Sequence, residues 1–238
     1  MNEPNIQFAL PNFSRSMKTL GVLFVGVWLV ESLVNRSAAV DTTPDPLGPF
    51  TALVLIPSRV AHGEVWRLVT HPFVHDPAGV QSVFWTVITL WFFGGVMETR
   101  WGLRRVLTAM AVTSVVSALA VVVVGAIYTP FWTQRAYSPA AATTMLAAAW
   151  GMSEGTRATS FLGIVSLTGR QFTAIFGVMI AVGFFFSQSP GSVLALVGLL
   201  VGAVLGNGPA RRASRPRTES APKLRVIKGG IDSRDLPN

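Results

Sequence analysis

The sequence predicts an all-helical membrane protein with a bundle of six membrane-spanning helices. Three observations lead to this prediction. Half of the 238 residues are hydrophobic and only 13% are charged, whereas a soluble domain carries about 25% charged residues. The hydrophobic residues fall into runs close to the length that crosses a bilayer, about 20 residues. The basic residues between these runs favour one orientation. A soluble globule and a largely disordered chain are therefore excluded.

The apolar runs differ in length. In chain order they are Leu20–Val34, Val80–Met97, Val106–Tyr128, Tyr137–Met152, Phe172–Phe186 and Gly191–Gly208. The second and third runs contain no charged residue and can cross a bilayer unaided. The first, fourth and fifth are shorter than the lower limit of about 17 residues. We therefore expect their ends to include polar neighbours or to lie inside the bundle.

The distribution of Lys and Arg predicts the orientation. With six crossings and the N-terminus in the cytoplasm, 15 of the 19 basic residues lie on the cytoplasmic side and 4 lie on the opposite side. The positive-inside rule therefore predicts that both termini are cytoplasmic. The cysteine-free composition, rich in Ala, Val and Arg, suggests a bacterial inner membrane as the location.

Three regions are expected. Residues 1–16 form an N-terminal cytoplasmic flank, residues 17–208 a six-helix membrane domain, and residues 209–238 a basic, mobile cytoplasmic tail that can lie against anionic lipid. Within the membrane domain, residues 36–79 form a long first outer loop. A structureless loop of that length is uncommon in a compact domain. We therefore expect it to be helical, with Trp66 as an anchor at the membrane interface.

Few residues suggest chemistry by themselves. The chain has no cysteine, which excludes disulfides, thiolate metal sites and a cysteine nucleophile. His71 and His75 are four residues apart and Asp76 follows, a spacing that could bind a metal on a helix. Pro72 disturbs that helix and no third ligand is evident, so hydrogen-bonded interfacial histidines are favoured. We expect no metal, no cofactor and no nucleic-acid partner.

One stretch of the long loop has a distinctive order. Residues 63–75 read Gly-Glu-Val-Trp-Arg-Leu-Val-Thr-His-Pro-Phe-Val-His, with Trp66 beside Arg67 and with His75 at the end. This order resembles the Trp-Arg motif in the first outer loop of the rhomboid superfamily of intramembrane proteins, followed by the start of that family's second helix. We expect Arg67 to donate hydrogen bonds to backbone carbonyls of its own loop. A contact with a partner helix is the alternative role.

A second stretch, residues 90–102, places Gly94, Glu98 and Gly102 four residues apart. It looks like the end of the second rhomboid helix, where a Gly, a Glu four residues later and a further Gly are typical. Arg100 lies between Glu98 and Gly102. We expect Glu98 and Arg100 to pair with each other at the cytoplasmic end of this helix, as a structural contact.

The last apolar run is similar to the closing helix of that superfamily. Gly198, Gly202 and Gly206 are four residues apart, and small residues on one face allow another helix to approach closely. We expect that neighbour to be the alanine-rich fourth run, although these glycines could instead face lipid or a second copy of the chain. With the two motifs, the resemblance covers roughly residues 17–208.

The resemblance also implies which residues an active member would need. An active rhomboid has a nucleophilic Ser in a Gly-x-Ser-Gly motif on the fourth helix and a His base on the sixth, because a serine hydroxyl needs a base to become a good nucleophile. The corresponding positions hold Thr143 or Ser138 and, on the sixth run, Ala195. Ser82 and Thr86 stand at the positions where an active rhomboid has residues that support the oxyanion. The last three runs contain no histidine.

Three functions remain open from the sequence. The favoured one is a catalytically inactive rhomboid-like protein, a pseudoprotease, that binds membrane lipids and the transmembrane helices of client or complex partners. The second is an active rhomboid serine endopeptidase with atypical site residues. The third is a structural subunit of a larger membrane complex. A fold supports several functions, and the sequence specifies neither the partner nor the oligomeric state.

Overall fold

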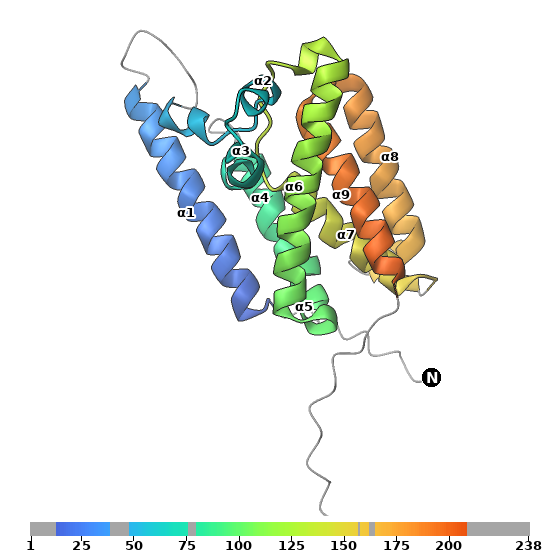
Figure 1. Cartoon of the computed structure of the whole chain (residues 1–238). Helices are drawn as coiled ribbons and strands as arrows, with labels where there is room; N and C mark the ends of the chain where they lie inside the picture. Colours follow the sequence, from blue (N-terminus) through green and yellow to red (C-terminus); the bar gives the residue numbers. More distant parts are fainter. Residues whose placement is uncertain (1–12, 39–47, 76–79, 157, 162–164, 209–238) are drawn as a thin grey trace, which may run out of the picture.

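The computed structural model describes residues 13–38, 48–75, 80–156, 158–161 and 165–208. Its long helices are α1 Arg15–Ala38, α4 Val80–Thr89 continuing through η3 Leu90–Gly94 into α5 Gly95–Trp101, α6 Leu103–Ile127, α7 Ala140–Glu154, α8 Gly169–Ser187 and α9 Pro190–Asn207. They stand side by side as a bundle (Figure 1). The predicted tail, residues 209–238, and most of the N-terminal flank lie outside the described residues.

Five helical segments are long and apolar enough to cross a membrane. They are Arg15–Val34, Val80–Trp101, Leu103–Ile127, Gly169–Ser187 and Pro190–Asn207. Large apolar side chains are exposed on their outer faces, such as Val22 on α1 and Phe186 on α8, which are 71% and 82% exposed. Apolar surface of this extent is typical of helices that face lipid. The chain is therefore an integral membrane protein with several spans.

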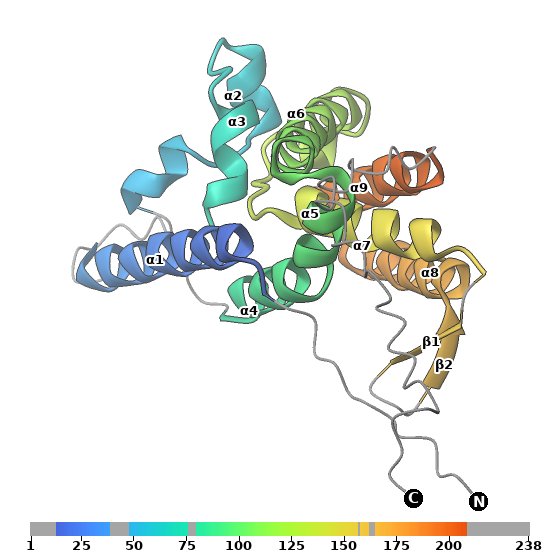
Figure 2. The same ribbon diagram turned by 90° about the horizontal axis from the view of Figure 1, so that it is seen from below.

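The predicted fourth run forms α7, which is not among those five segments. It has only 15 residues, and every residue from 141 to 151 is buried. A helix that is apolar on all sides is usually enclosed by others. Here α7 contacts α4, α5, α6, α8 and α9, and it lies in the middle of the bundle when the molecule is seen from below (Figure 2).

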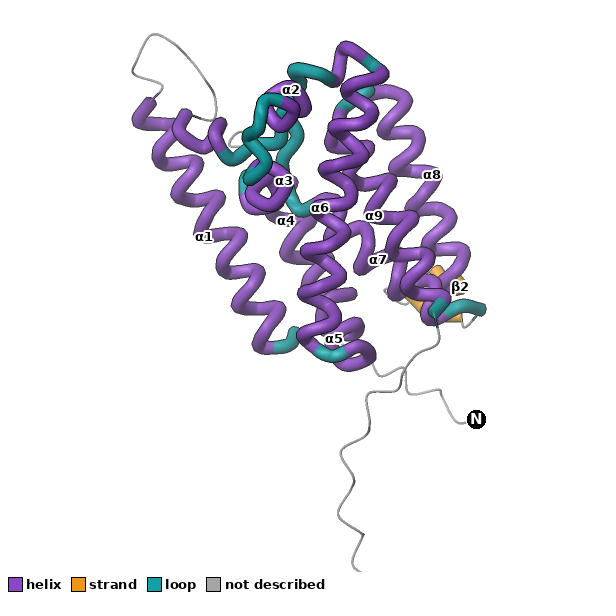
Figure 3. The backbone as a smooth tube through the Cα atoms, viewed as in Figure 1, coloured by secondary structure: helices purple, strands orange, loops and turns teal. Residues whose placement is uncertain are grey.

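The segment between α1 and α4 folds as short helical turns joined by loops (Figure 3). These turns are η1 Gly48–Ala52, α2 Pro57–Ala61, α3 Arg67–Thr70 and η2 His71–Phe73. We call residues 48–75 the outer segment. It lies between α1 and α6, at the end of the bundle away from α5 (Figure 1).

A small antiparallel hairpin departs from the all-helical prediction. Strands β1 Ala158–Phe161 and β2 Val165–Thr168 pair with Ala158 opposite Thr168. The hairpin connects α7 to α8, and Thr168 caps α8 by accepting a hydrogen bond from the backbone N–H of Gln171. Paired strands of only four residues are short enough to escape a search for apolar runs.

The helix that includes α4 and α5 contains a π-helical turn, η3, in its middle. Gly94 ends this turn and is buried against α1. A Cβ atom added at Gly94 would lie 2.8 Å from the Sδ atom of Met17. The absence of a side chain at Gly94 therefore lets α1 approach this helix closely.

Candidate functional site

Three glycines of α9 lie against the backbone of α7. A Cβ atom added at any of them would overlap a carbonyl oxygen of α7. The pairs are Gly198 with Ala141, Gly202 with Met145, and Gly206 with Ala149. Because no side chains intervene, α7 and α9 are in backbone contact along most of α7. This is the helix pair on which the resemblance places a nucleophile and a base.

The hydroxyl groups at this helix pair bond to backbone. The Oγ1 atom of Thr143 lies 3.1 Å from the carbonyl oxygens of both Pro139 and Ala140, within its own helix. The Oγ1 atom of Thr144 lies 2.7 Å from the carbonyl oxygen of Ala140 and 3.0 Å from that of Ala195 on α9. A carbonyl oxygen can accept the hydroxyl proton in a hydrogen bond, but it cannot remove it as an imidazole can.

Ser138 connects the outer segment to the start of α7. Its backbone N–H donates to the carbonyl oxygens of Val74 at 2.8 Å and His71 at 3.2 Å. Its φ angle is +81°, a left-handed conformation that is uncommon for a residue other than glycine. Its Oγ atom accepts a hydrogen bond from the backbone N–H of Ala140 at 3.3 Å. The sequence places every histidine far from this position, whereas the fold brings the backbone of His71 to it.

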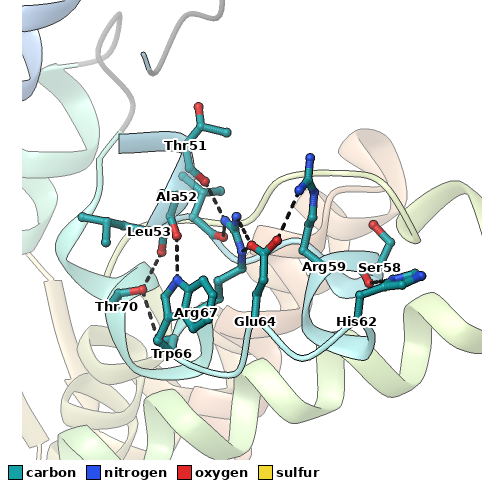
Figure 4. Close-up of polar contacts among 11 residues, drawn as sticks. Thr51, Ala52, Leu53, Ser58, Arg59, His62, Glu64, Trp66, Arg67 and Thr70 are labelled. Atoms are coloured by element: carbon teal, nitrogen blue, oxygen red, sulfur yellow. Dashed lines mark hydrogen bonds and ion pairs between the residues drawn. The ribbon is translucent and has the colours of Figure 1, made fainter. Parts of the chain in front are cut away.

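The Trp-Arg motif fastens the outer segment to itself (Figure 4). Arg67 is 4% exposed, and its Nη1 atom donates to the carbonyl oxygens of Thr51 at 2.6 Å and Val54 at 2.5 Å. Trp66 Nε1 donates to the carbonyl oxygen of Ala52 at 3.0 Å. Thr70 Oγ1 donates to that of Leu53 at 2.8 Å. Three side chains therefore satisfy four successive carbonyls, at positions 51 to 54.

Glu64 completes this set of contacts. It forms an ion pair with Arg67 and a second one with Arg59 at 3.2 Å. The hydrogen bond from Arg67 is the main reason that the pKa of the Glu64 carboxyl group is lowered. Because Arg67 is buried, its charge requires this partner. Arg59 is mostly exposed, so the Arg59 contact contributes less.

His71 and His75 are fully buried within the chain, and the Nδ1 atom of His71 lies 3.2 Å from the carbonyl oxygen of Arg67. Their place at the membrane interface stays a prediction. Helix α1 covers His75. The ring of Phe24 lies 5.5 Å from the ring of His75, and Glu31 Oε2 accepts a hydrogen bond from the backbone N–H of His75 at 3.0 Å. Burial lowers the pKa of both histidines to about 4, so their neutral forms are favoured at neutral pH.

No group of three or more potential metal ligands occurs among the described residues. Asp76, which follows His75 in the sequence, lies outside them. Within the described part of the chain, Glu31 Oε1 and both ring nitrogens of His75 have no hydrogen-bond partner. The contact between Glu31 and His75 could not be predicted from the sequence because the two residues are 44 positions apart.

Glu98 and Arg100 do not pair with each other, contrary to the prediction. Glu98 accepts hydrogen bonds from the hydroxyls of Ser14 at 2.5 Å and Ser16 at 3.0 Å. Arg100 donates to Ser153 Oγ at 2.5 Å and forms an ion pair with Glu154. Residues two apart on a helix point to different sides. Glu98 therefore fastens α5 to the start of α1, and Arg100 fastens α5 to the end of α7.

Ser82 and Thr86, which stand at the positions of the oxyanion-supporting residues of an active rhomboid, lie on one turn of α4. Thr86 Oγ1 donates to the carbonyl oxygen of Ser82 at 2.8 Å. Ser82 Oγ is buried and has no partner among the described residues. Gly102, the last glycine of the second motif, joins α5 to α6 with a φ angle of +81°, a conformation that glycine adopts without steric cost.

These features define the class of the protein. It is a helical membrane protein with several spans, and its outer segment is held by hydrogen bonds from side chains to its own backbone. Residues 18–205 match the family described as eukaryotic integral membrane protein (DUF1751), and the chain belongs to this family. No curated protein matches the chain.

The family assignment corrects one prediction. Because the family is described as eukaryotic, the bacterial inner membrane suggested by composition is wrong. An Ala- and Val-rich composition reflects the hydrocarbon that surrounds the helices, and any bilayer supplies that environment. Composition therefore indicates a membrane without indicating which one.

Proposed function

We propose that the chain is a catalytically inactive rhomboid-like membrane protein that binds the transmembrane helices of other proteins. The observation that supports catalytic inactivity is the hydrogen bond from the Thr144 hydroxyl to the carbonyl oxygen of Ala195. Serine hydrolysis requires a nucleophile, a base and donors for the oxyanion. The hydroxyls of α7 bond to backbone carbonyls, and α9 offers a carbonyl where a base is required.

The rhomboid-like arrangement that we propose has six helices, with the short α7 as the fourth. Its enclosure by α4, η3, α5, α6, α8 and α9 explains how 15 residues can be accommodated within the bilayer. The positions taken from the resemblance then act as structural residues. They are Trp66, Arg67, His75, Gly94, Glu98, Arg100, Gly102, Gly198 and Gly202. Their contacts within the chain, rather than contacts with a substrate, support this role.

The first experiment tests catalysis. The purified full-length protein is incubated with a fluorophosphonate probe and, separately, with a model transmembrane substrate in liposomes. We expect neither labelling nor cleavage, because no base is available where Thr144 of α7 faces α9. Cleavage that is lost in Ser138→Ala would contradict the proposal. That outcome would favour an active endopeptidase, the alternative supported by the left-handed backbone of Ser138 and its contact with the His71 carbonyl.

The second experiment tests partner binding. The tagged chain is purified in mild detergent and the associated proteins are identified by mass spectrometry. Membrane proteins present below stoichiometric amounts would support binding of client helices. A fixed stoichiometric set would instead identify a structural subunit. Recovery of the chain alone, after crosslinking in the membrane as well, would contradict partner binding.

A further inference from the structure

A groove of about 200 Å³ lies between α1 and α6. Leu20 and Phe24 form the wall on α1, and residues from Leu107 to Val115 form the wall on α6. Ala142 of α7 lies at its floor. The outer segment enters between the same two helices at the end away from α5 (Figure 1). Its Phe73 lines the groove, with its ring 5.9 Å from that of Phe24.

The interior of the groove offers no free polar group to a ligand. Ser114 is the one residue with a side-chain hydroxyl in the lining. Its Oγ atom donates to the carbonyl oxygen of Met110 at 2.9 Å within α6. A ligand segment inside the groove therefore has to be apolar.

The dimensions favour a thin ligand over a helix. From Leu107 to Val115 the lining rises by about 12 Å at 1.5 Å per residue. A bilayer has about 30 Å of hydrocarbon, so the groove spans close to one leaflet. A transmembrane helix needs the full thickness and a channel about 10 Å wide, and Phe73 of the outer segment lines the groove. An acyl chain satisfies both limits.

The open end of the groove carries positive charge. Arg104 precedes Leu107 by three residues and Ala111 by seven, so it lies on the same side of α6 as these lining residues. Arg104 is exposed and forms no ion pair with a described residue. Glu98, the nearest acid in sequence to Arg104, accepts hydrogen bonds from Ser14 and Ser16.

We propose that this groove binds one acyl chain of an anionic phospholipid, and that Arg104 contacts the phosphate of its headgroup. The apolar lining selects a hydrocarbon chain, the length matches one leaflet, and the charge at the open end selects an anionic headgroup. The proposal does not depend on the catalytic or partner-binding state of the chain.

The experiment uses the full-length protein in nanodiscs that contain phosphatidylglycerol with a diazirine in its acyl chain. After irradiation, labelled peptides are mapped by mass spectrometry. We expect label on residues 20–24 of α1 and 107–115 of α6, in preference to the outer face of α8. Equal labelling of α8 and the groove would overturn the proposal.

Variants test the two parts of the site. Ala111→Phe fills the groove from an exposed position and should abolish labelling there, whereas the matched control Val112→Phe, on the neighbouring exposed position, should not. Arg104→Gln should lower the preference for phosphatidylglycerol over phosphatidylcholine by about fivefold, the effect of one basic residue near a membrane surface. Arg105→Gln is the control for Arg104→Gln. In the wild type, the Cζ atom of Arg105 lies 5.1 Å from the centroid of the Trp101 ring.

Two results would contradict the proposal. Retained groove labelling in Ala111→Phe would show that the lipid binds elsewhere. An unchanged lipid preference in Arg104→Gln would show that Arg104 does not contact the headgroup. Circular dichroism and thermal unfolding check that each variant is folded. If Ala111→Phe does not fold, the labelling map of the wild-type chain decides the question.

Discussion

The Oγ1 atom of Thr144 on α7 lies 3.0 Å from the carbonyl oxygen of Ala195 on α9. Both residues stand where the two helices are in backbone contact, next to the pair formed by Gly198 and Ala141. A side chain larger than alanine at position 195 would have to fit beside this contact. The region therefore offers a backbone carbonyl where a base would be required.

The first prediction concerns restoration of activity. Thr143→Ser alone and Ala195→His alone should both remain unreactive toward a fluorophosphonate probe, because the members of a catalytic group act as a unit. Labelling is measured after denaturing electrophoresis, with a known serine hydrolase as the positive control. Labelling of either single variant at the new residue would contradict the prediction.

The second prediction concerns the glycine contacts of α9. Gly202→Leu should destabilise the protein by about 1–3 kcal/mol, the typical cost of overpacking a core, because its side chain would meet the Met145 carbonyl and Ala148. Gly183→Leu on α8 is the control, since nothing lies within 4 Å of a Cβ added there. Denaturant unfolding in detergent measures both. A variant at Gly202 that keeps its stability and loses only self-association would indicate a dimer contact instead.

The third prediction concerns Arg67. Arg67→Ala should lower the free energy of unfolding by about 1.5–3 kcal/mol, the range for hydrogen bonds to charged groups, because the carbonyls of Thr51 and Val54 lose their donor. Arg59→Ala is the control, with an expected loss below about 1 kcal/mol for an exposed ion pair. If Arg67→Ala kept its thermal stability and lost partner binding, Arg67 would instead be a recognition residue.

The fourth prediction concerns pH. His71 and His75 have a pKa of about 4 in the folded chain and 6.5 as a reference. Below pH 6.5 the unfolded chain binds more protons than the folded chain, so stability is greatest above that pH and falls as the pH approaches 4. His75→Gln removes one titrating group and should reduce this slope, although Glu31, which faces His75, remains.

Thermal unfolding between pH 7.5 and pH 4, compared with the wild type, measures the slope. His62→Gln, at an exposed position, serves as the matched control variant. Slopes equal to that of the wild type in both His71→Gln and His75→Gln would contradict the prediction.

The fifth prediction concerns the number of crossings. If α7 counts as one crossing, a tag inserted after Asn207 and a tag in the turn at Thr129–Phe131 should lie on opposite sides of the membrane. The ends of α6 and α9, which these sites follow, lie at opposite ends of the bundle (Figure 1). Accessibility of each tag to a membrane-impermeant reagent, before and after permeabilisation, measures the sides. Equal accessibility of both tags in sealed vesicles would contradict the six-helix arrangement.

The long spans could be predicted from sequence because apolar length alone defines them. The run Val106–Tyr128 corresponds to α6, Leu103–Ile127. The four-residue spacing of Gly198, Gly202 and Gly206 also indicated which face of α9 contacts α7, because residues four apart share a side of a helix. The same spacing could not reveal that Glu98 and Arg100 bond to different helices, since their partners come from α1 and α7.

Other features depend on contacts distant in sequence. His71 and His75 look exposed in a polar, proline-rich segment, whereas both are buried, His75 against Phe24 of α1. Glu31 looks like a charge that interrupts an apolar run, whereas it accepts a hydrogen bond from the backbone of His75. The length of α7 suggested a marginal span, and its enclosure on all sides became evident only with its neighbours in place.

The π-helical turn at Leu90–Gly94 also determines which residues of α5 face the neighbouring helices. A π-turn holds one residue more than an α-helical turn. Deletion of a single residue there would restore a regular α-helical turn, and α5 would keep its rotation because the wider turn accommodates the extra residue. Glu98 would still face the serines of α1, and Arg100 would still face Glu154. We therefore expect a one-residue deletion inside this turn to be tolerated far better than a one-residue deletion elsewhere in α4 or α5, which would rotate every later residue of the helix by about 100°.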